Sequence, residues 1–199
     1  MEATRFSTGA LNSSSFRYGR AGGELSKASP KLDSPNIEQL DANSLSSHRP
    51  PMRNPFMQMA LEEAAAAATR GEVPVGAVLV GPDGAVLARD GNRIVELKDP
   101  TAHAELMVIR AGARALGSER LTGCDLHVTL EPCPMCAQAM AFARIRRVYY
   151  GAADPKGGGV DHGPRIFAQP TCHHAPEVYG GIGEGDAARL LKDFFAARR

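Results

Sequence analysis

The chain has 199 residues, of which 43% are hydrophobic and 23% are charged, and its formal net charge at pH 7 is +1. This length suits one α/β domain with a sizeable core, and the near-zero charge excludes a protein that coats nucleic acid through bulk positive charge. Four cysteines are too few for a disulfide scaffold, and no apolar run approaches the roughly 18 residues of a membrane-spanning helix.

Residues 1–51 differ in composition from the rest of the chain. They contain ten serines and four prolines among scattered charges, without a sustained apolar period. Such a segment cannot bury enough apolar surface to offset its ordering entropy, so we predict a disordered N-terminal extension at 1–51 and a folded domain at 52–199. Five acidic against six basic residues do not fit an acid-poor transit peptide. A start of translation at Met52 is the other interpretation.

The domain is predicted to begin with a helix and a β-hairpin. Asn54 is a suitable N-cap, a proline follows at the first helical position, and an Ala-rich run continues the helix over 55–69. Two β-like runs follow at 73–80 and 85–89. The segment 81–84, Gly-Pro-Asp-Gly, joins them as a tight turn, because proline presets φ and glycine tolerates unusual φ.

Helices and strands alternate in the second half of the chain. After Pro100-Thr101 a helix is predicted whose buried face is marked by Ala102, Leu106, Ile109, Ala113 and Leu116. A buried strand at 126–130, a helix starting at Pro132, a strand at 148–150 and a tail helix over 185–199 follow. This alternation favours an α/β sandwich around one sheet.

Two fragments carry candidate chemistry, His103-x-Glu105 and Pro132-Cys133-x-x-Cys136. For this composition, His-x-Glu is expected by chance roughly 0.4 times and Pro-Cys-x-x-Cys roughly 0.005 times, so the second is the informative one. Each lies at the start of a predicted helix, where unpaired N–H groups and partial positive charge favour the thiolate that binds metal. One imidazole and two thiolates would leave a tetrahedral Zn²⁺ one position for water, as in catalytic sites.

Glu105 distinguishes a catalytic zinc site from a structural one. Two residues after His103 at the start of a helix, it can point into the same pocket without binding the metal. Zinc lowers the pKa of its water to about 7. A neighbouring carboxylate can take the proton and later deliver it to a ring nitrogen and a leaving amine. The set suits hydrolytic loss of ammonia from an amidine-like carbon.

These residues resemble the cytidine deaminase superfamily and, within it, the bacterial tRNA-specific adenosine deaminase (TadA) family. The resemblance covers nearly all of 52–199 and none of 1–51. Its segments are 72–78, 91–93, 101–105, 128–133, 143–145, 151–156 and 193–195. It implies a cytidine-deaminase-like α/β sandwich, with a central mixed sheet of about five strands flanked by helices.

On this resemblance we expect a zinc-dependent hydrolase that converts adenosine to inosine at the wobble position, position 34, of a tRNA anticodon. The expected partners are the tRNA anticodon stem-loop and a second copy in a homodimer, and the expected location is the cytoplasm. One Zn²⁺ per subunit would bind His103, Cys133 and Cys136, with Glu105 as proton shuttle. The expected substrate contacts are Val75 and Asn92 at the base or ribose, Asp154 and Lys156 at neighbouring nucleotides, and Phe194 of the tail helix beside the loop.

Other interpretations stay open at this point. The zinc motifs do not distinguish RNA from a free nucleobase or nucleoside such as guanine or cytosine, although the loop 153–156 and the tail favour RNA. A structural zinc would take a fourth ligand from 172–174, Cys-His-His, and a redox Cys-x-x-Cys would need no histidine upstream. An inactive subunit would have no use for Glu105. Residues 160–176 depart from the family pattern, which leaves the RNA side of the pocket undefined.

Three arginines, Arg144, Arg146 and Arg147, crowd the end of the second motif's helix. One interpretation is a solvated charged face that complements the helix C-terminus. The other is a local patch for RNA phosphates, completed by Lys156 and by Arg165, Arg198 and Arg199.

Overall fold

The computed structural model describes residues 54–198, so the predictions for 1–51 and for Met52 lie outside the described residues. Its strands are β1 (Gly76–Val80), β2 (Val86–Gly91), β3 (Asp125–Leu130), β4 (Arg147–Ala152) and β5 (Glu177–Tyr179). Its helices are α1 (Pro55–Thr69), α2 (Ile94–Leu97), α3 (Ala104–Leu116), α4 (Pro134–Ala143) and α5 (Glu184–Ala196), with a short 3₁₀ helix, η1 (Ile166–Ala168). Among these residues, no helix is both long and apolar enough to cross a membrane.

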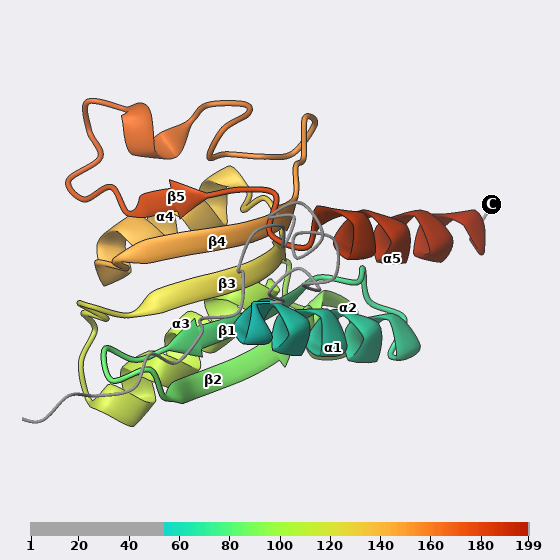
Figure 1. Cartoon of the computed structure of the whole chain (residues 1–199), viewed down its shortest axis with the longest axis horizontal. Coiled ribbons are helices and arrows are strands. Elements are labelled where there is room, and N and C mark those ends of the chain that lie inside the picture. Colours follow the sequence, from blue (N-terminus) through green and yellow to red (C-terminus); the bar gives the residue numbers. More distant parts are fainter. Residues whose placement is uncertain (1–53, 199) are drawn as a thin grey trace, which may run out of the picture. The chain divides into compact units, whose positions relative to one another are not determined.

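The strands form one mixed sheet in the order β2-β1-β3-β4-β5. Strand β1 is antiparallel to β2 and β3, whereas β3, β4 and β5 run parallel. Helices α1 and α5 cover one face of the sheet, and α3 and α4 cover the other (Figure 1). The predicted α/β sandwich with about five strands is therefore confirmed. Because β3 and β4 are parallel, their carboxyl ends meet at the same edge, where the loops before α4 and after β4 begin.

Helix α1 begins and packs as its sequence predicts. The side chain of Asn54 accepts hydrogen bonds from the N–H groups of Phe56 and Met57, at 3.0 and 3.1 Å. The small buried residues of α1 allow its backbone to lie almost directly on β1. A Cβ atom at Gly76 would be 2.1 Å from the Ala60 carbonyl oxygen, so only glycine fits there.

The buried face of α3 differs from the predicted one by a small rotation. Leu116, predicted to be buried, is 44% exposed at the end of the helix. The innermost residues are instead Ala104, Val108 and Gly112, spaced four apart. A Cβ at Gly112 would be 2.2 Å from the Leu79 side chain, so this glycine allows α3 to approach β1 closely. Glu105 is also buried on this helix, which the apolar pattern did not include.

Several boundaries differ from the predictions. Helix α4 begins at Pro134 rather than Pro132, because Cys133 has extended backbone angles and is the N-cap. Strand β1 begins at Gly76, and the three residues before it form a separate turn in which the Val75 N–H donates to the Val73 carbonyl. Short elements without a periodic pattern, α2, η1 and β5, were not predicted.

Candidate active site

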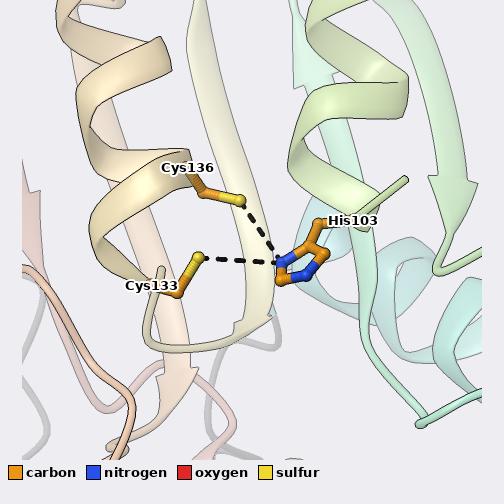
Figure 2. Close-up of side chains that lie close together, drawn as sticks. All are labelled: His103, Cys133 and Cys136. Atoms are coloured by element: carbon orange, nitrogen blue, oxygen red, sulfur yellow. Dashed lines mark hydrogen bonds between the residues drawn. The ribbon is translucent and has the colours of Figure 1, made fainter. Parts of the chain in front are cut away.

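The three predicted zinc ligands come together at the start of two helices. His103 is the N-cap of α3 and Cys133 is the N-cap of α4, both with extended backbone angles. Cys136 lies one turn into α4 and is fully buried. Figure 2 shows the imidazole of His103 facing both sulfur atoms from the opposite helix. The positive ends of two helix dipoles therefore point at the same place, which favours thiolates and a ligand set that carries negative charge.

The distances between these ligand atoms fit a tetrahedral zinc ion. Nδ1 of His103 is 3.7 Å from the Cys133 sulfur and 3.6 Å from the Cys136 sulfur. Zn–S and Zn–N bonds of about 2.3 and 2.0–2.1 Å at a tetrahedral angle place nitrogen and sulfur about 3.6 Å apart. Within residues 54–198 this is the only His, Cys, Asp or Glu group that could hold a metal. The donor set and its spacing thus fit zinc, with one position left for a non-protein ligand.

Residues 172–174 supply no fourth ligand, which contradicts the structural-zinc interpretation. The Cys172 thiol donates to the His174 carbonyl oxygen at 3.1 Å. The ring nitrogen Nε2 of His174 is 2.6 Å from the Ile145 carbonyl oxygen. The Cys172 and His174 side chains are thus occupied by carbonyl oxygens, and neither belongs to the group around His103.

The two thiols of the site have different acidities. The hydrogen bond from Cys136, together with His103, lowers the pKa of Cys133 to about 4, although desolvation opposes the shift. The pKa of Cys136 is raised, first by its hydrogen bond with Cys133 and then by burial. Cys133 is thus a thiolate at neutral pH, the form that binds metal.

Glu105 lies in the first turn of α3, two residues after His103, and is only 3% exposed. Burial is the largest influence on this carboxyl and raises its pKa to about 7. A general acid–base works best when its pKa is close to the working pH. A pKa of about 7 therefore suits the proton transfer that the sequence predicts for this residue.

A cavity of about 220 Å³ opens beside these residues. His103, Glu105 and Cys133 line it together with three predicted substrate contacts, Val75, Asn92 and Asp154. This volume is below the roughly 300 Å³ of pockets for drug-sized ligands, which suits a single flat base better than a whole nucleotide. A larger groove of about 340 Å³ between α1 and α5 contains none of the predicted site residues.

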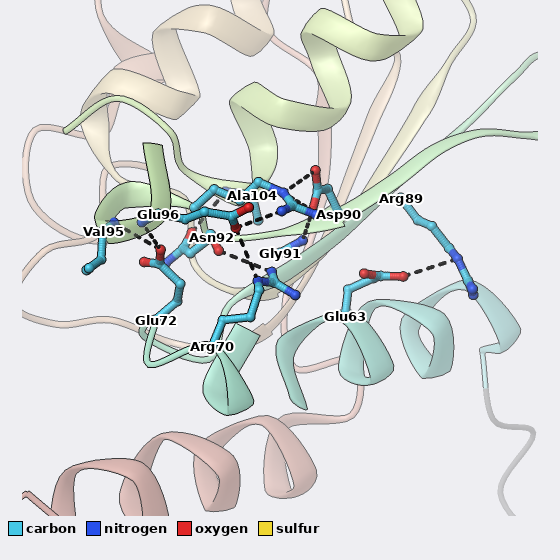
Figure 3. A network of polar contacts seen from close by, with 11 residues as sticks. Glu63, Arg70, Glu72, Arg89, Asp90, Gly91, Asn92, Val95, Glu96 and Ala104 are labelled. Atoms are coloured by element: carbon cyan, nitrogen blue, oxygen red, sulfur yellow. Dashed lines mark hydrogen bonds and ion pairs between the residues drawn. The ribbon is translucent and has the colours of Figure 1, made fainter. Parts of the chain in front are cut away.

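The amide of Asn92 is held in one orientation by its neighbours. Its Oδ1 accepts the Ala104 N–H at the start of α3, at 2.9 Å, and its Nδ2 donates to the Val73 carbonyl at 3.2 Å. Figure 3 shows the surrounding network, in which Glu72 accepts the Val95 and Glu96 N–H groups of α2. The oxygen thus faces the helix, and the second hydrogen of Nδ2 is the group that can reach a ligand.

Two other predicted contacts do not line the cavity. Lys156 is exposed, in a turn where Oδ1 of Asp154 accepts the N–H groups of Lys156 and Gly157 at 3.1 and 3.0 Å. Phe194 is only 8% exposed and lies beneath the Arg198 guanidinium, 3.5 Å from the ring centroid. Its neighbour Phe195 is 48% exposed, so the tail helix presents that ring to solvent instead.

The arginine cluster at the end of α4 is largely paired. Arg146 makes two hydrogen bonds of 2.8 Å to the carboxylate of Asp125. Arg147 pairs with Glu177 at 3.2 Å, and Arg144 donates to a carbonyl oxygen at 2.8 Å. These contacts favour the first interpretation, in which the three arginines form a solvated charged face. They speak against the second, in which the arginines bind RNA phosphates.

Glu131 lines the cavity but was not among the predicted site residues. It follows β3 and precedes Cys133 by two residues, and its side chain is fully buried. Desolvation raises its pKa, yet hydrogen bonds from the Asp154 and His162 N–H groups outweigh this and hold the pKa below its usual value. The signal in the sequence was a carboxylate between a buried strand and the Pro-Cys motif, where a buried charge needs partners.

A mixed sheet with His, Cys and Cys at two helix starts and a buried glutamate beside them defines a zinc-dependent deaminase. In agreement, residues 52–152 match the family described as "Cytidine and deoxycytidylate deaminase zinc-binding region". The tRNA-specific adenosine deaminase of Agrobacterium fabrum is 62% identical over 147 residues, which are 74% of this chain and 96% of that protein. The chain belongs to the tRNA-specific adenosine deaminase family and is a zinc-dependent hydrolase.

Solved structures agree with this assignment. One from a study of A-to-I editing by tRNA:A34 deaminases at the wobble position of transfer RNA is 63% identical, with a TM-score of 0.68, and covers 70% of this chain and 100% of that one. A guanine deaminase from Nitrosomonas europaea is 20% identical, with a TM-score of 0.63, and covers 84% of this chain and 100% of that one. The second likeness shows the shared fold alone.

Proposed function

We propose that this chain deaminates adenosine to inosine at the wobble position, position 34, of a tRNA anticodon. Water adds to C6 of adenine and ammonia leaves, so adenosine and water become inosine and ammonia. The observation that carries the proposal is the buried Glu105 beside His103 and the two cysteines, in a chain 62% identical to a tRNA-specific adenosine deaminase.

In this proposal His103, Cys133 and Cys136 hold one zinc ion. Zinc, when bound there, supplies a Lewis acid that makes a water molecule acidic near pH 7. The Glu105 carboxylate accepts a proton from the attacking water and delivers it to the ring nitrogen N1 of adenine. The same carboxylate then takes the remaining proton from the added hydroxyl and hands it to the amine, which leaves as ammonia while the C6 carbonyl forms. A pKa near neutrality permits both transfers.

Val75 and Asn92 are proposed to hold the base. Val75 is 6% exposed and gives the cavity an apolar wall. Asn92 has its oxygen occupied by the Ala104 N–H, so its remaining N–H can donate a hydrogen bond to an oxygen or ring nitrogen of the ligand. A base must leave its stack to enter such a cavity, and the single-stranded anticodon loop allows that at low cost.

Asp154, Lys156 and Phe194 are proposed to act on the nucleotides around the target base and not on the base itself. Asp154 lines the mouth and caps the turn that carries the Lys156 ammonium, which can meet a phosphate of the loop. The buried ring of Phe194 is proposed to hold α5 in place while the exposed Phe195 offers a stacking surface.

We further propose that the working enzyme is a homodimer in the cytoplasm. On α4, the partly buried Met135 and Ala139 and the 68% exposed Phe142 recur at steps of four and three, which gives one apolar stripe on the helix surface. A second copy would cover this stripe. The four cysteines are free, in keeping with a reducing compartment. Light scattering on F142E tests the dimer, since a dimeric variant would contradict this interface.

The deciding experiment compares substrates. Purified protein is incubated with an anticodon stem-loop containing A34 and, separately, with adenosine, guanine and cytosine, and inosine and ammonia are measured. We expect inosine in the RNA and little ammonia from free bases. Ammonia from guanine or cytosine without inosine in RNA would favour a nucleobase deaminase of the same superfamily.

A further inference from the structure

Glu131 makes an unusually complete set of hydrogen bonds for a side chain that the chemistry does not use. Its Oε1 accepts the N–H groups of Val160, Asp161 and His162 at 3.3, 2.9 and 2.9 Å. Its Oε2 accepts the Asp154 N–H at 3.0 Å and lies 2.7 Å from Nδ1 of His162, which donates because a carboxylate can only accept. All five donors belong to one loop, residues 154–162, which leaves β4.

This arrangement ties both ends of the loop to a single buried group. Asp154 stands at the beginning of the loop and His162 at its end, and each bonds the same carboxylate. Between them, Gly158 lies so close that a Cβ would be 2.5 Å from the Oε1 atom of Glu131. An ionised carboxylate offers these five donors about four lone-pair sites and a full negative charge, whereas a neutral side chain with a single acceptor oxygen would leave several of them unpaired.

The loop also lies against the start of α4, next to the zinc ligands. The Gly159 N–H donates to the Pro132 carbonyl at 2.8 Å. A Cβ at Gly159 would be 2.5 Å from the Pro134 nitrogen. Asp154, Gly157 and Glu131 itself line the cavity together with Val75. The loop is therefore one wall of the pocket, placed by Glu131 and by the backbone before α4.

The outer side of this wall is exposed and carries a positive charge. Pro155, Lys156 and Gly157 are exposed, and no ion pair among the described residues involves Lys156. The carboxylate of Asp154 orders this turn through the Lys156 and Gly157 N–H groups. Lys156 precedes Gly157, which lines the cavity, so its ammonium is placed to meet phosphates beside a nucleotide whose base enters the cavity.

We propose that Glu131 is a positioning residue for RNA binding, which fixes the loop 154–162 and through Asp154 sets the place of Lys156 at the pocket rim. This inference rests on the proposed function, because it takes the ligand at the rim to be a polynucleotide. Glu131 is not in the group that could hold the metal, and in this proposal it transfers no proton. Its loss affects the affinity for RNA and leaves the chemical step and the zinc content intact.

The test is the variant E131Q, compared with E119Q as a matched control, since the Glu119 side chain is 85% exposed. A glutamine oxygen can serve the three N–H groups of 160–162, but its NH₂ then faces the Asp154 N–H, donor against donor. We expect KM for the A34 stem-loop to rise about tenfold, the effect of losing a hydrogen bond to a charged group, with kcat within about twofold. Zinc content should equal that of the wild type.

Hydrogen exchange gives a measurement that does not depend on activity. In E131Q the Asp154 amide should exchange faster, while the Asp161 and His162 amides keep most of their protection. If the wild type makes no inosine, the proposed function fails, and the exchange pattern still reports whether Glu131 holds the loop 154–162. Unchanged exchange at Asp154, loss of zinc, or a fall in kcat without a rise in KM would each overturn the proposal.

Two further variants complete the design. K156A should raise KM by itself, and E131Q in that background should add less than about twofold, because both changes act through the same cation. Additive effects would contradict the proposed route. If E131Q does not fold, H162A removes one donor and keeps the carboxylate, and we expect KM to rise about threefold. An unchanged KM in H162A, with Asp154 exchange also unchanged, would overturn the proposal.

Discussion

Two buried carboxyl groups, Glu105 and Glu131, line the same cavity, but their pKa values are shifted in opposite directions. Glu105 is 3% exposed and Glu131 is 2% exposed, so burial alone predicts a raised pKa for both. Burial does raise the pKa of Glu105 to about 7. The pKa of Glu131 lies below its usual value, because hydrogen bonds from the loop 154–162 outweigh desolvation. Hydrogen-bond partners, more than depth, therefore separate the two residues.

The difference in pKa suits the two carboxyl groups to different roles, proton transfer for Glu105 and loop positioning for Glu131. A carboxyl group that transfers protons must exist in both protonation states near neutral pH, and Glu105, with few partners, meets that condition. A carboxylate that holds a loop must stay ionised, and the five donors around Glu131 keep it so. Similar burial thus gives one group for proton transfer and one for placing the pocket wall.

Removal of a zinc ligand has the largest expected effect. H103A leaves both carboxylates in place but takes away one of three ligands. We expect zinc content below about a tenth of an ion per subunit and activity at background. Metal analysis and an inosine assay measure both. H173A, which alters an exposed histidine outside the site, should keep full zinc and activity. Normal zinc in H103A would mean that His103 is not a ligand.

E105Q tests the proton-transfer side of the comparison. Glutamine keeps the shape of the side chain and cannot shuttle a proton, so kcat should fall about 10³-fold. Zinc content and affinity for the A34 stem-loop should stay within about twofold of the wild type, because Glu105 binds neither in this proposal. Turnover at the wild-type rate would show that Glu105 is not the proton shuttle. Equal losses of kcat in E105Q and E131Q would contradict the separate roles of the two carboxyl groups.

The sequence predicted the long elements and the clustering of the three candidate zinc ligands well, for a physical reason. Apolar periodicity and capping residues mark α1, α3 and the central strands, and His103, Cys133 and Cys136 stand in short motifs at helix starts. Strand β5 has only three residues, half-exposed or exposed, so it leaves no alternating pattern. It forms because β4 offers a free parallel edge.

The role of Glu131 could not be predicted in this way. Most of its partners are main-chain N–H groups, 23 to 31 residues further along the chain. Every residue except proline has such a group, so the sequence carries no signal for which ones will converge. The same holds for the orientation of Asn92, which depends on a backbone N–H at the start of α3. Side-chain motifs are visible in a sequence, whereas backbone donors become visible only in the fold.

G158A disturbs the packing of the loop 154–162 against Glu131 without changing the charge of that carboxylate. A Cβ at Gly158 would be 2.5 Å from the Glu131 carboxylate and 2.6 Å from the Asp154 carbonyl oxygen. We expect a loss of about 1–3 kcal/mol in the free energy of unfolding, measured by urea denaturation. G185A is the matched control, because a Cβ there meets nothing within 4 Å, and in a helix it should be neutral or stabilising by up to about 1 kcal/mol. Equal stabilities of the two variants would show that the loop does not need this close contact.

His127 shows what desolvation does without partners, on the other face of the sheet. It is 3% exposed and lies between the rings of Phe56 and Tyr149, with centroids at 5.1 and 4.5 Å. Its Nδ1 has no hydrogen-bond partner among residues 54–198. Burial lowers its pKa from 6.5 to about 4. This contrasts with Glu131, where hydrogen bonds reverse the effect of burial.

The smallest predicted effect follows from this shift. Between pH 6.5 and 4 the unfolded chain binds a proton at this histidine and the folded chain does not, so stability falls as the pH falls through this range. From pH 7.5 to 5.5 the contribution amounts to about 1 kcal/mol in the free energy of unfolding. H127F keeps the stack of rings and cannot titrate, so its stability should fall by about 1 kcal/mol less than that of the wild type over the same interval. If both proteins lose the same stability, the proton is taken up elsewhere, and burial of His127 has not lowered its pKa as its surroundings require.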